Sequence, residues 1–247
     1  MRVLIAIPVF NERKYVAGVL AKVHRHASDV LFIDDGSTDG TAQWLARQPG
    51  IRLIQHGTNQ GYGQSLIDAF DYADRHGFDW VITMDCDEQH EPERIADFLR
   101  GIQTDQWDII SGSRYLKHFS SDSAAPGDRQ MINAQITTMI NELFSWTLTD
   151  SFCGFKAHRV SATKALNLTE TGYAFPLQLW PRVYRQGLRL VEIPVERIYK
   201  DASRTFGGTL NDPTSRLQHY MEVFRRELQS PLPKPQDDKS IACCCGV

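Results

Sequence analysis

The sequence D-C-D-E-Q-H at residues 85–90 carries the chain's clearest chemical pattern, and it directly follows the apolar run 80–84. Because side chains alternate in an extended segment, we expect Asp85, Asp87 and Gln89 to project to one side. Their oxygen atoms suit Mg²⁺ or Mn²⁺, which keeps further positions for water and a diphosphate. Two carboxylates at a strand end are also common as turn or helix-cap residues, so the pattern needs support from elsewhere in the chain.

Four other polar clusters follow short apolar runs in the same way. They are Asn11-Glu12, the D-D-G-S-T-D-G of residues 34–40, the N-Q-G-Y-G of residues 59–63 and the G-S-R-Y of residues 112–115. In a parallel α/β sheet, the ligand crevice lies outside the carboxyl ends of the strands. Five clusters at strand ends therefore point to one shared site.

The elements that would position these clusters alternate between strand and helix. Strands are predicted at residues 3–9, 30–33, 51–54, 80–84 and 108–111, and apolar residues at helical spacing lie between them. The alternation predicts an α/β fold with a mostly parallel central sheet flanked by helices. Farther on, we expect helices near 129–147, 175–186 and 214–228, and strand-like segments at 150–157 and 188–195.

We expect a single domain over residues 1–228, made of two halves at 1–115 and 116–228. The proline-containing tail at 229–247 is expected to be disordered.

Composition narrows the class of protein. The chain has 247 residues with 42% hydrophobic and 23% charged side chains, which is typical of a globular domain. A net charge of −3 gives no general case for nucleic-acid binding. The first apolar run is cut short by Asn11-Glu12 without a cleavage site, and no run approaches the roughly 18 apolar residues of a membrane span. We therefore expect a cytoplasmic protein. Its five cysteines, including Cys86 and Cys153, do not suggest a disulfide framework.

Two common nucleotide motifs are missing from the sequence. The turn after the first predicted strand is P-V-F-N-E at residues 8–12 instead of G-x-G-x-x-G, and no G-x-x-x-x-G-K-[ST] occurs. NAD and ATP are therefore disfavoured, and a metal-bridged diphosphate remains.

Taken in order, the motifs at residues 8–12, 34–40, 59–63, 85–90 and 112–115 resemble those of family 2 glycosyltransferases. The D-x-D-x-Q-H and G-S-R-Y forms are most similar to dolichyl- and polyprenyl-phosphate mannosyltransferases. The resemblance is strong over residues 1–115 and weaker to about residue 208. It implies a GT-A fold, a UDP- or GDP-hexose donor and a divalent metal ion, Mg²⁺ or Mn²⁺.

The resemblance also implies that residues 1–115 form a nucleotide-sugar-binding half and residues 116–228 an acceptor half, and it implies roles for residues on the donor side. The metal would be held by Asp85, Asp87 and Gln89 and would stabilise the departing UDP or GDP. Tyr62 stands where many relatives have lysine. The residues that would contact the donor nucleotide are Pro8, Phe10, Glu12, Asp35, Asn59, Gly61 and Asp85.

On the acceptor side, Arg114 and Arg129 match positions that hold a lipid phosphate in the relatives, a task that suits forked guanidinium groups. Asp150 would orient the acceptor or act as a base. Arg204 fits a loop that closes on the diphosphate, although the Ser-Lys pair of the relatives is missing there. For His90, Asp39 and Arg216 a functional role is the alternative, but we expect exposed polar residues.

Gln178 occupies the region where mannosyltransferase relatives usually have glutamate. Glutamine cannot accept a proton, but a phosphate monoester is already a nucleophile near neutral pH. We therefore expect a metal-dependent, inverting transfer of a hexose to a polyprenyl phosphate, by a protein that contacts the inner face of the membrane peripherally. The alternatives are a soluble glycan or small-molecule hydroxyl as acceptor, a nucleotidyltransferase, and a non-catalytic nucleotide-sugar sensor.

Overall fold

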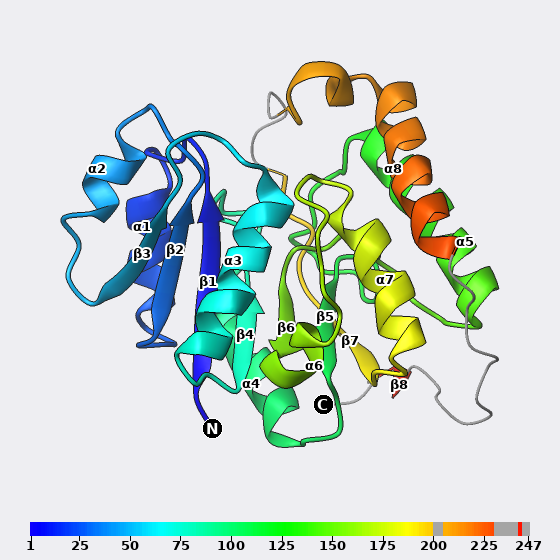
Figure 1. Cartoon of the computed structure of the whole chain (residues 1–247), viewed down its shortest axis with the longest axis horizontal. Helices are drawn as coiled ribbons and strands as arrows, with labels where there is room; N and C mark the ends of the chain where they lie inside the picture. The colour runs from blue at the N-terminus through cyan, green and yellow to red at the C-terminus, as the bar shows by residue number, and fades with distance from the viewer. Residues whose placement is uncertain (200–204, 230–241, 244–247) are drawn as a thin grey trace.

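The computed structural model describes residues 1–199, 205–229 and 242–243, and one mixed sheet runs through its centre (Figure 1). The strands are β1 (Val3–Val9), β2 (Val30–Asp34), β3 (Ile51–Gln55), β4 (Trp80–Thr83), β5 (Ile109–Ser113), β6 (Lys156–Arg159), β7 (Leu190–Pro194) and β8 (Ala242–Cys243). The α-helices are α1 (Val16–Val23), α2 (Thr41–Leu45), α3 (Tyr62–Arg75), α4 (Ile95–Gln103), α5 (Gly127–Phe144), α6 (Val160–Lys164), α7 (Phe175–Arg185) and α8 (Pro213–Leu228), with 3₁₀ turns at Pro92–Arg94 and Gly208–Asn211.

The strand order is β3-β2-β1-β4-β6-β5-β7-β8. β6 runs antiparallel to both of its neighbours, β4 and β5, and every other neighbouring pair is parallel. The carboxyl ends of the parallel strands therefore lie along one edge, which is the upper edge of the sheet in Figure 1. The predicted α/β fold with a mostly parallel sheet is confirmed.

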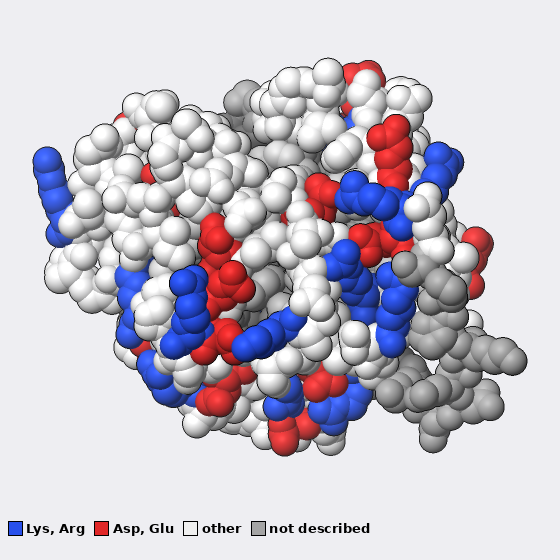
Figure 2. Space-filling model, viewed as in Figure 1, with Lys and Arg blue, Asp and Glu red and all other residues white. Residues whose placement is uncertain are grey.

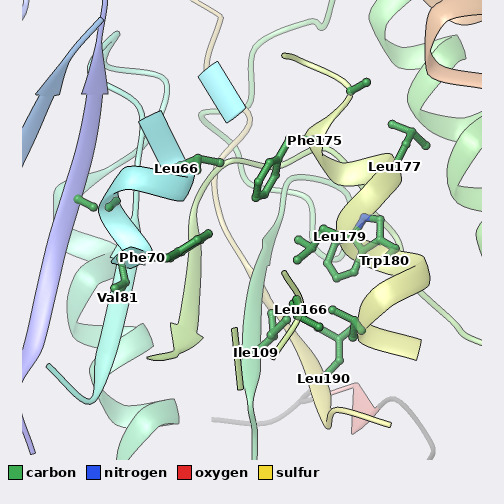
Figure 3. Packing of buried hydrophobic residues seen from close by; sticks show 14 of the residues in the cluster. Leu66, Phe70, Val81, Ile109, Leu166, Phe175, Leu177, Leu179, Trp180 and Leu190 are labelled. Carbon is green, nitrogen blue, oxygen red and sulfur yellow. The ribbon is translucent and has the colours of Figure 1, made fainter. Parts of the chain in front are cut away.

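Side-chain alternation along the strands divides the core into two layers. In β1, Leu4 and Ala6 join a cluster with residues of α3, α5, α7 and α8, whereas Ile5 and Ile7 join a cluster with residues of α1 and α4. Figure 3 shows the first layer, where Phe70 of α3 and Trp180 of α7 lie over the sheet. Both faces are thus covered, as the continuous apolar strands predict.

The segment 150–157, expected to be strand-like, is strand only from Lys156 onward. Residues 150–155 form an irregular segment that leads into β6 at the carboxyl edge of β4 and β5. Because β6 is antiparallel, its amino end lies beside the carboxyl ends of its neighbours. The first residues of this segment thus reach the edge where the predicted site lies.

Within the stretch predicted to be a disordered tail, Ala242 and Cys243 pair with β7 as the short edge strand β8. This pairing covers part of the edge that β7 would otherwise present to solvent. No helix in the described part of the chain is long and apolar enough to cross a membrane. On the face shown in Figure 2, acidic and basic side chains are intermingled, without a broad patch of one sign.

Candidate active site

The segment with Asp85 and Asp87 is a turn, not an extended strand. β4 ends at Thr83, and Glu88 has φ +58°, so the chain bends where alternation was expected. Glu88 turns toward α1, where its carboxylate lies 3.6 Å from the Lys22 ammonium group. The prediction of an extended segment here is therefore wrong. Without an extended backbone, side-chain alternation no longer places Gln89 beside the two aspartates.

Asp85 is held by contacts from helix α3, from the segment 150–155 and from within its own turn. Its Oδ1 accepts a hydrogen bond from the Tyr62 hydroxyl at 3.1 Å, and its backbone N–H donates to His90 Nδ1 at 2.9 Å. A Cβ atom at Gly154 would lie 2.7 Å from the Tyr62 hydroxyl and 2.9 Å from Asp85 Oδ2, so a larger residue there would displace these side chains. Asp87 Oδ1 accepts the backbone N–H of Gln89 at 3.0 Å, which closes the turn.

The carboxylates of this turn fit a Mg²⁺ or Mn²⁺ ion whose remaining ligands would come from the substrate and water. No cluster of three or more His, Cys, Asp or Glu side chains in metal-binding proximity occurs among the described residues. Mg²⁺ is commonly held by one or two carboxylates together with substrate phosphates and water. The partly exposed Asp85, whose side chain is 33% accessible, and Asp87 supply such carboxylates.

His90 lies under this turn and is buried, contrary to the expectation of an exposed residue. Burial lowers the pKa of His90 to about 4, although the charge of Asp87 acts in the opposite direction. A neutral ring fits its geometry, because Nδ1 accepts the hydrogen bond from the Asp85 backbone. His90 therefore supports the turn as a neutral acceptor.

The first two polar clusters bind each other. Glu12 donates its backbone N–H to Thr41 Oγ1 at 3.0 Å, and the Asn11 side chain accepts the backbone N–H of Thr38 at 2.8 Å. Glu12 is buried, Pro8 is half-buried in β1, and Phe10 is 46% exposed at the rim. These predicted donor residues thus lie next to the turn that follows β2.

Asp35 connects this turn to the cluster at residues 59–63. Its carboxylate accepts the backbone N–H groups of Gln60 at 2.7 Å and Gly61 at 2.9 Å, and a ring nitrogen of His56 lies 2.7 Å away. A Cβ atom at Gly36 would lie 2.6 Å from the carbonyl carbon of Thr58, so the two turns are in direct backbone contact. Asp35 therefore holds the second turn as well as being a predicted donor contact, while the predicted contact Asn59 is exposed.

Arg114 and Asp150 form a buried ion pair on the acceptor side. Arg114 donates to Asp150 through Nε at 2.6 Å, through Nη2 at 2.9 Å and through its backbone N–H at 3.2 Å. A third guanidinium nitrogen donates to the Tyr199 hydroxyl at 3.2 Å. Since a guanidinium has five N–H groups, two remain for an acceptor.

Asp150 is fully buried, and its charge is held by this pair. Burial raises the pKa of the carboxyl group, but Arg114 outweighs burial and the pKa falls to about 2. Asn133 also donates to Asp150, at 2.8 Å, and Glu192 accepts the backbone N–H of Asp150 at 3.0 Å. The predicted role as a base does not fit this environment, whereas orienting the acceptor through Arg114 does.

Arg129 lies at the start of α5, beside a cavity of about 170 Å³. Its guanidinium lies 4.8 Å from the centre of the Phe206 ring, and that of Arg216 lies 4.4 Å from the same ring. Arg216 is buried and pairs with Asp128, so the expectation of an exposed residue is wrong. The predicted loop residue Arg204 lies outside the described residues.

Gln178 points into the protein core. Its side-chain oxygen accepts the backbone N–H groups of Thr169 and Glu170 at 2.6 and 2.8 Å, and its amide nitrogen donates to Glu227 at 2.7 Å. Gln178 is thus a structural link between the loop before α7 and helix α8. The thiol of Cys153 is also buried, which raises its pKa to about 11 and makes it a poor nucleophile.

The sequence analysis did not identify His56, Asn133 and Glu192. His56 contacts Asp35, whereas Asn133 and Glu192 both contact Asp150. No local motif marks them, because each meets its partner across the fold. His56 alone had a usable signal, since it directly follows a strand at the same sheet edge as the polar clusters.

Comparison with known proteins gives concordant results. Residues 4–166 match the sequence profile described as Glycosyl transferase family 2. The chain is 30% identical over 223 residues to the undecaprenyl-phosphate mannosyltransferase of Micrococcus luteus, covering 86% of this chain and 90% of that protein. It is 28% identical over 204 residues to the polyprenol monophosphomannose synthase of Mycolicibacterium smegmatis, covering 78% and 76%.

Among solved structures, the fold is similar to that of glucosyl-3-phosphoglycerate synthase from Mycobacterium tuberculosis in complex with Mn²⁺, UDP-glucose and phosphoglyceric acid. The TM-score is 0.68 at 15% sequence identity, over 93% of this chain and 80% of that one. At this identity the likeness concerns the fold alone.

Proposed function

Because the chain belongs to glycosyltransferase family 2, we propose that it moves a hexose from a UDP- or GDP-sugar to a polyprenyl phosphate. Its fold is the GT-A fold expected from the sequence. Membership of a glycosyltransferase family disfavours the nucleotidyltransferase and the non-catalytic sensor. The donor, the metal ion and the acceptor are the parts that we propose.

The observation that carries the proposal is the state of the acceptor side. Asp150 is fully buried in its ion pair with Arg114, and Gln178 lies in the core, so neither position offers a general base to an acceptor. A sugar hydroxyl needs such a base, whereas a phosphate monoester with a second pKa of about 6 is already anionic. A phosphate acceptor therefore suits these residues better than a hydroxyl acceptor.

In the proposed reaction, an acceptor phosphate oxygen attacks the anomeric carbon in line with the bond to the leaving diphosphate. That bond breaks, its electron pair departs with UDP or GDP, and the anomeric configuration inverts. Asp85 and Asp87 would hold a divalent ion, which would stabilise the negative charge that develops on the diphosphate. The two remaining N–H groups of Arg114, together with Arg129, orient the acceptor phosphate.

The names of the two bacterial relatives support a lipid-linked acceptor, since both contain a polyprenyl carrier. A protein that acts on such a carrier must reach the membrane surface. We propose that this chain does so by peripheral contact near Arg129, at the start of α5.

The test is transfer of radiolabelled sugar from UDP-glucose, UDP-N-acetylglucosamine or GDP-mannose to a short polyprenyl phosphate with Mn²⁺. We expect label in the butanol-extractable lipid, loss of transfer when EDTA removes the metal, and loss with Asp87→Ala. Label that appears only in an aqueous product lacking phosphate would favour a soluble hydroxyl acceptor. Transfer that survives Asp87→Ala unchanged would exclude the metal-dependent mechanism.

A further inference from the structure

His56, the residue after β3, lies between two carboxylates that come from different parts of the chain. Its Nδ1 is 2.7 Å from Asp35 Oδ1, at the end of β2, and its Nε2 is 2.8 Å from Asp68 Oδ2, on α3. The ring is 6% exposed. Neutral imidazole has one N–H group and can donate to one of these carboxylates, whereas imidazolium donates to both.

The Asp35 side of this arrangement reaches the donor site. Asp35 also accepts the backbone N–H groups of Gln60 and Gly61, and Gly61 has φ +107°, a conformation that favours glycine. The next residue, Tyr62, donates its hydroxyl to Asp85 at 3.1 Å. One short turn therefore connects the predicted nucleoside contact to the predicted metal ligand.

The Asp68 side anchors the same turn to the helix that follows it. Asp68 lies in the second turn of α3, and its second oxygen accepts a hydrogen bond from the Gln64 side chain at 3.0 Å. Gln64 in turn donates its backbone N–H to Thr171 at 3.1 Å. His56 thus joins the end of β2 to the first turns of α3, on either side of residues 59–62.

We propose that His56 is a positioning residue for donor binding. By contacting both Asp35 and Asp68, it acts as a clamp that holds the turn at residues 59–62 in the conformation that binds the nucleotide. The inference rests on the proposed function, because it deepens the account of the same donor site. His56 touches neither the nucleotide nor the reacting atoms in this scheme. It acts through Asp35, Gln60 and Gly61.

The charges around the ring give the clamp a direction with pH. Burial lowers the pKa of His56, but the hydrogen bonds and charges of Asp35 and Asp68 outweigh it, so the pKa lies above 6.5. Among the residues that the structure describes, Asp35 at the end of β2 and Asp68 on α3 are the charged groups in contact with the ring. Below that pKa both contacts are held; as pH rises through it, one N–H is lost and one side of the clamp weakens.

The experiment measures binding of UDP and of GDP, each with Mn²⁺, by calorimetry between about pH 6 and 9. For whichever nucleotide binds, we expect the wild-type Kd to rise through the titration of His56. Asp68→Asn keeps an acceptor for Nε2 but removes one charge, so the rise should move to lower pH by about one unit. His56→Gln has no titrating imidazole, so its Kd should be roughly tenfold weaker and should keep only the pH dependence of the nucleotide's own terminal phosphate, which all variants share.

Asp71→Asn is the matched control, because it makes the same chemical change on the same helix at an exposed position. It should leave both the Kd and its pH dependence unchanged. Thermal unfolding of each variant separates positioning from a merely structural role. Variants with a lowered Tm but wild-type Kd and pH dependence would overturn the inference.

The outcome also separates this inference from the proposed function. If wild type binds neither nucleotide, both fail. If it binds one of them with the expected pH dependence but transfers no sugar to a polyprenyl phosphate, only the proposed acceptor fails. If transfer to the lipid occurs and Asp68→Asn binds the nucleotide as wild type does at every pH, only the role of His56 fails.

Discussion

Replacing Asp150 by asparagine should strongly destabilise the protein, because the change leaves the buried Arg114 guanidinium without its counter-charge. The lowering of the Asp150 pKa from 3.8 to about 2 corresponds to roughly 2.5 kcal/mol, at about 1.36 kcal/mol for each unit. Breaking a buried ion pair by removing one partner typically costs about 3–5 kcal/mol. Since asparagine retains one acceptor oxygen for Asn133 or Phe152, we expect a loss of about 3 kcal/mol in the free energy of unfolding at neutral pH.

The pH dependence gives this prediction a sign. The folded-state pKa of Asp150 is lowered, so the ion pair contributes its full stability above the unfolded-state pKa near 3.8 and loses it as pH falls through about 2. Urea unfolding followed by circular dichroism measures the difference between wild type and Asp150→Asn. The difference should shrink as pH falls through about 4 to 2.

Asp108→Asn is the control for the same two-bond geometry with a more exposed arginine, although Asp108 itself is only 15% exposed and also pairs with Arg159 at 3.2 Å. Asp108 also accepts two hydrogen bonds from one guanidinium, that of Arg189, with both distances 3.0 Å. The Arg189 side chain is 46% exposed, however, so solvent screens this pair and we expect a loss of less than about 1 kcal/mol. If the two variants lose equal stability, or if Asp150→Asn loses less than the control, the argument from burial is refuted.

Three further predictions concern neighbouring residues. Gln178→Glu removes the hydrogen-bond donor to Glu227 and places a second carboxylate beside it, so the free energy of unfolding should fall by about 1–3 kcal/mol. Transfer to a hydroxyl acceptor should not improve, and a stable variant with faster transfer would contradict this. Burial raises the pKa of the Cys153 thiol to about 11, so this thiol should resist a thiol reagent at pH 8 until urea unfolds the protein. Labelling is located by peptide mass, and rapid labelling of Cys153 in the folded chain would show that the thiol is accessible. Tyr62→Phe removes the hydrogen bond to Asp85, so we expect a several-fold higher KM for the nucleotide sugar with little change in Tm, and an unchanged KM would show that this contact does not position Asp85 for the donor.

The parallel strands and the polar clusters at their ends were predictable because both depend on local patterns. The run at residues 3–9 is apolar throughout, and it forms β1 with both faces covered. Because ligands bind at the carboxyl ends of parallel strands, Asp35, Asp85 and Arg114 could be placed at the same sheet edge before any of their contacts were known. These features repeat in short windows of sequence, so a single sequence is sufficient to find them.

β6 was harder to predict because its residues do not form a typical apolar strand. Lys156 and His158 are both buried, and their burial depends on partners that lie far away in the sequence. The Lys156 ammonium group lies 5.3 Å from the centre of the Trp180 ring and donates to the Cys153 carbonyl. No spacing within the segment encodes such contacts.

The same limit applies to the turn after β4 and to His56. The bend at Glu88 requires a positive φ that its residue type does not announce. His56 meets Asp35 and Asp68 at separations of 21 and 12 residues, and nothing near it in the sequence marks either partner. A functional-site residue that contacts substrate is thus easier to find from sequence than the residue that positions it.

The place of β6 in the sheet has a consequence for the order of folding. β4 and β5 are consecutive strands joined by α4, and consecutive strands usually pair with each other. Here β6, which comes later in the chain, lies between them, so β4 and β5 must remain unpaired with each other until β6 has formed. Pairings this distant in sequence form slowly. We therefore expect insertion of β6 to limit the folding rate, so that weakening β6 slows refolding more than it speeds unfolding. Direct pairing of β4 with β5 would be the characteristic misfolded intermediate.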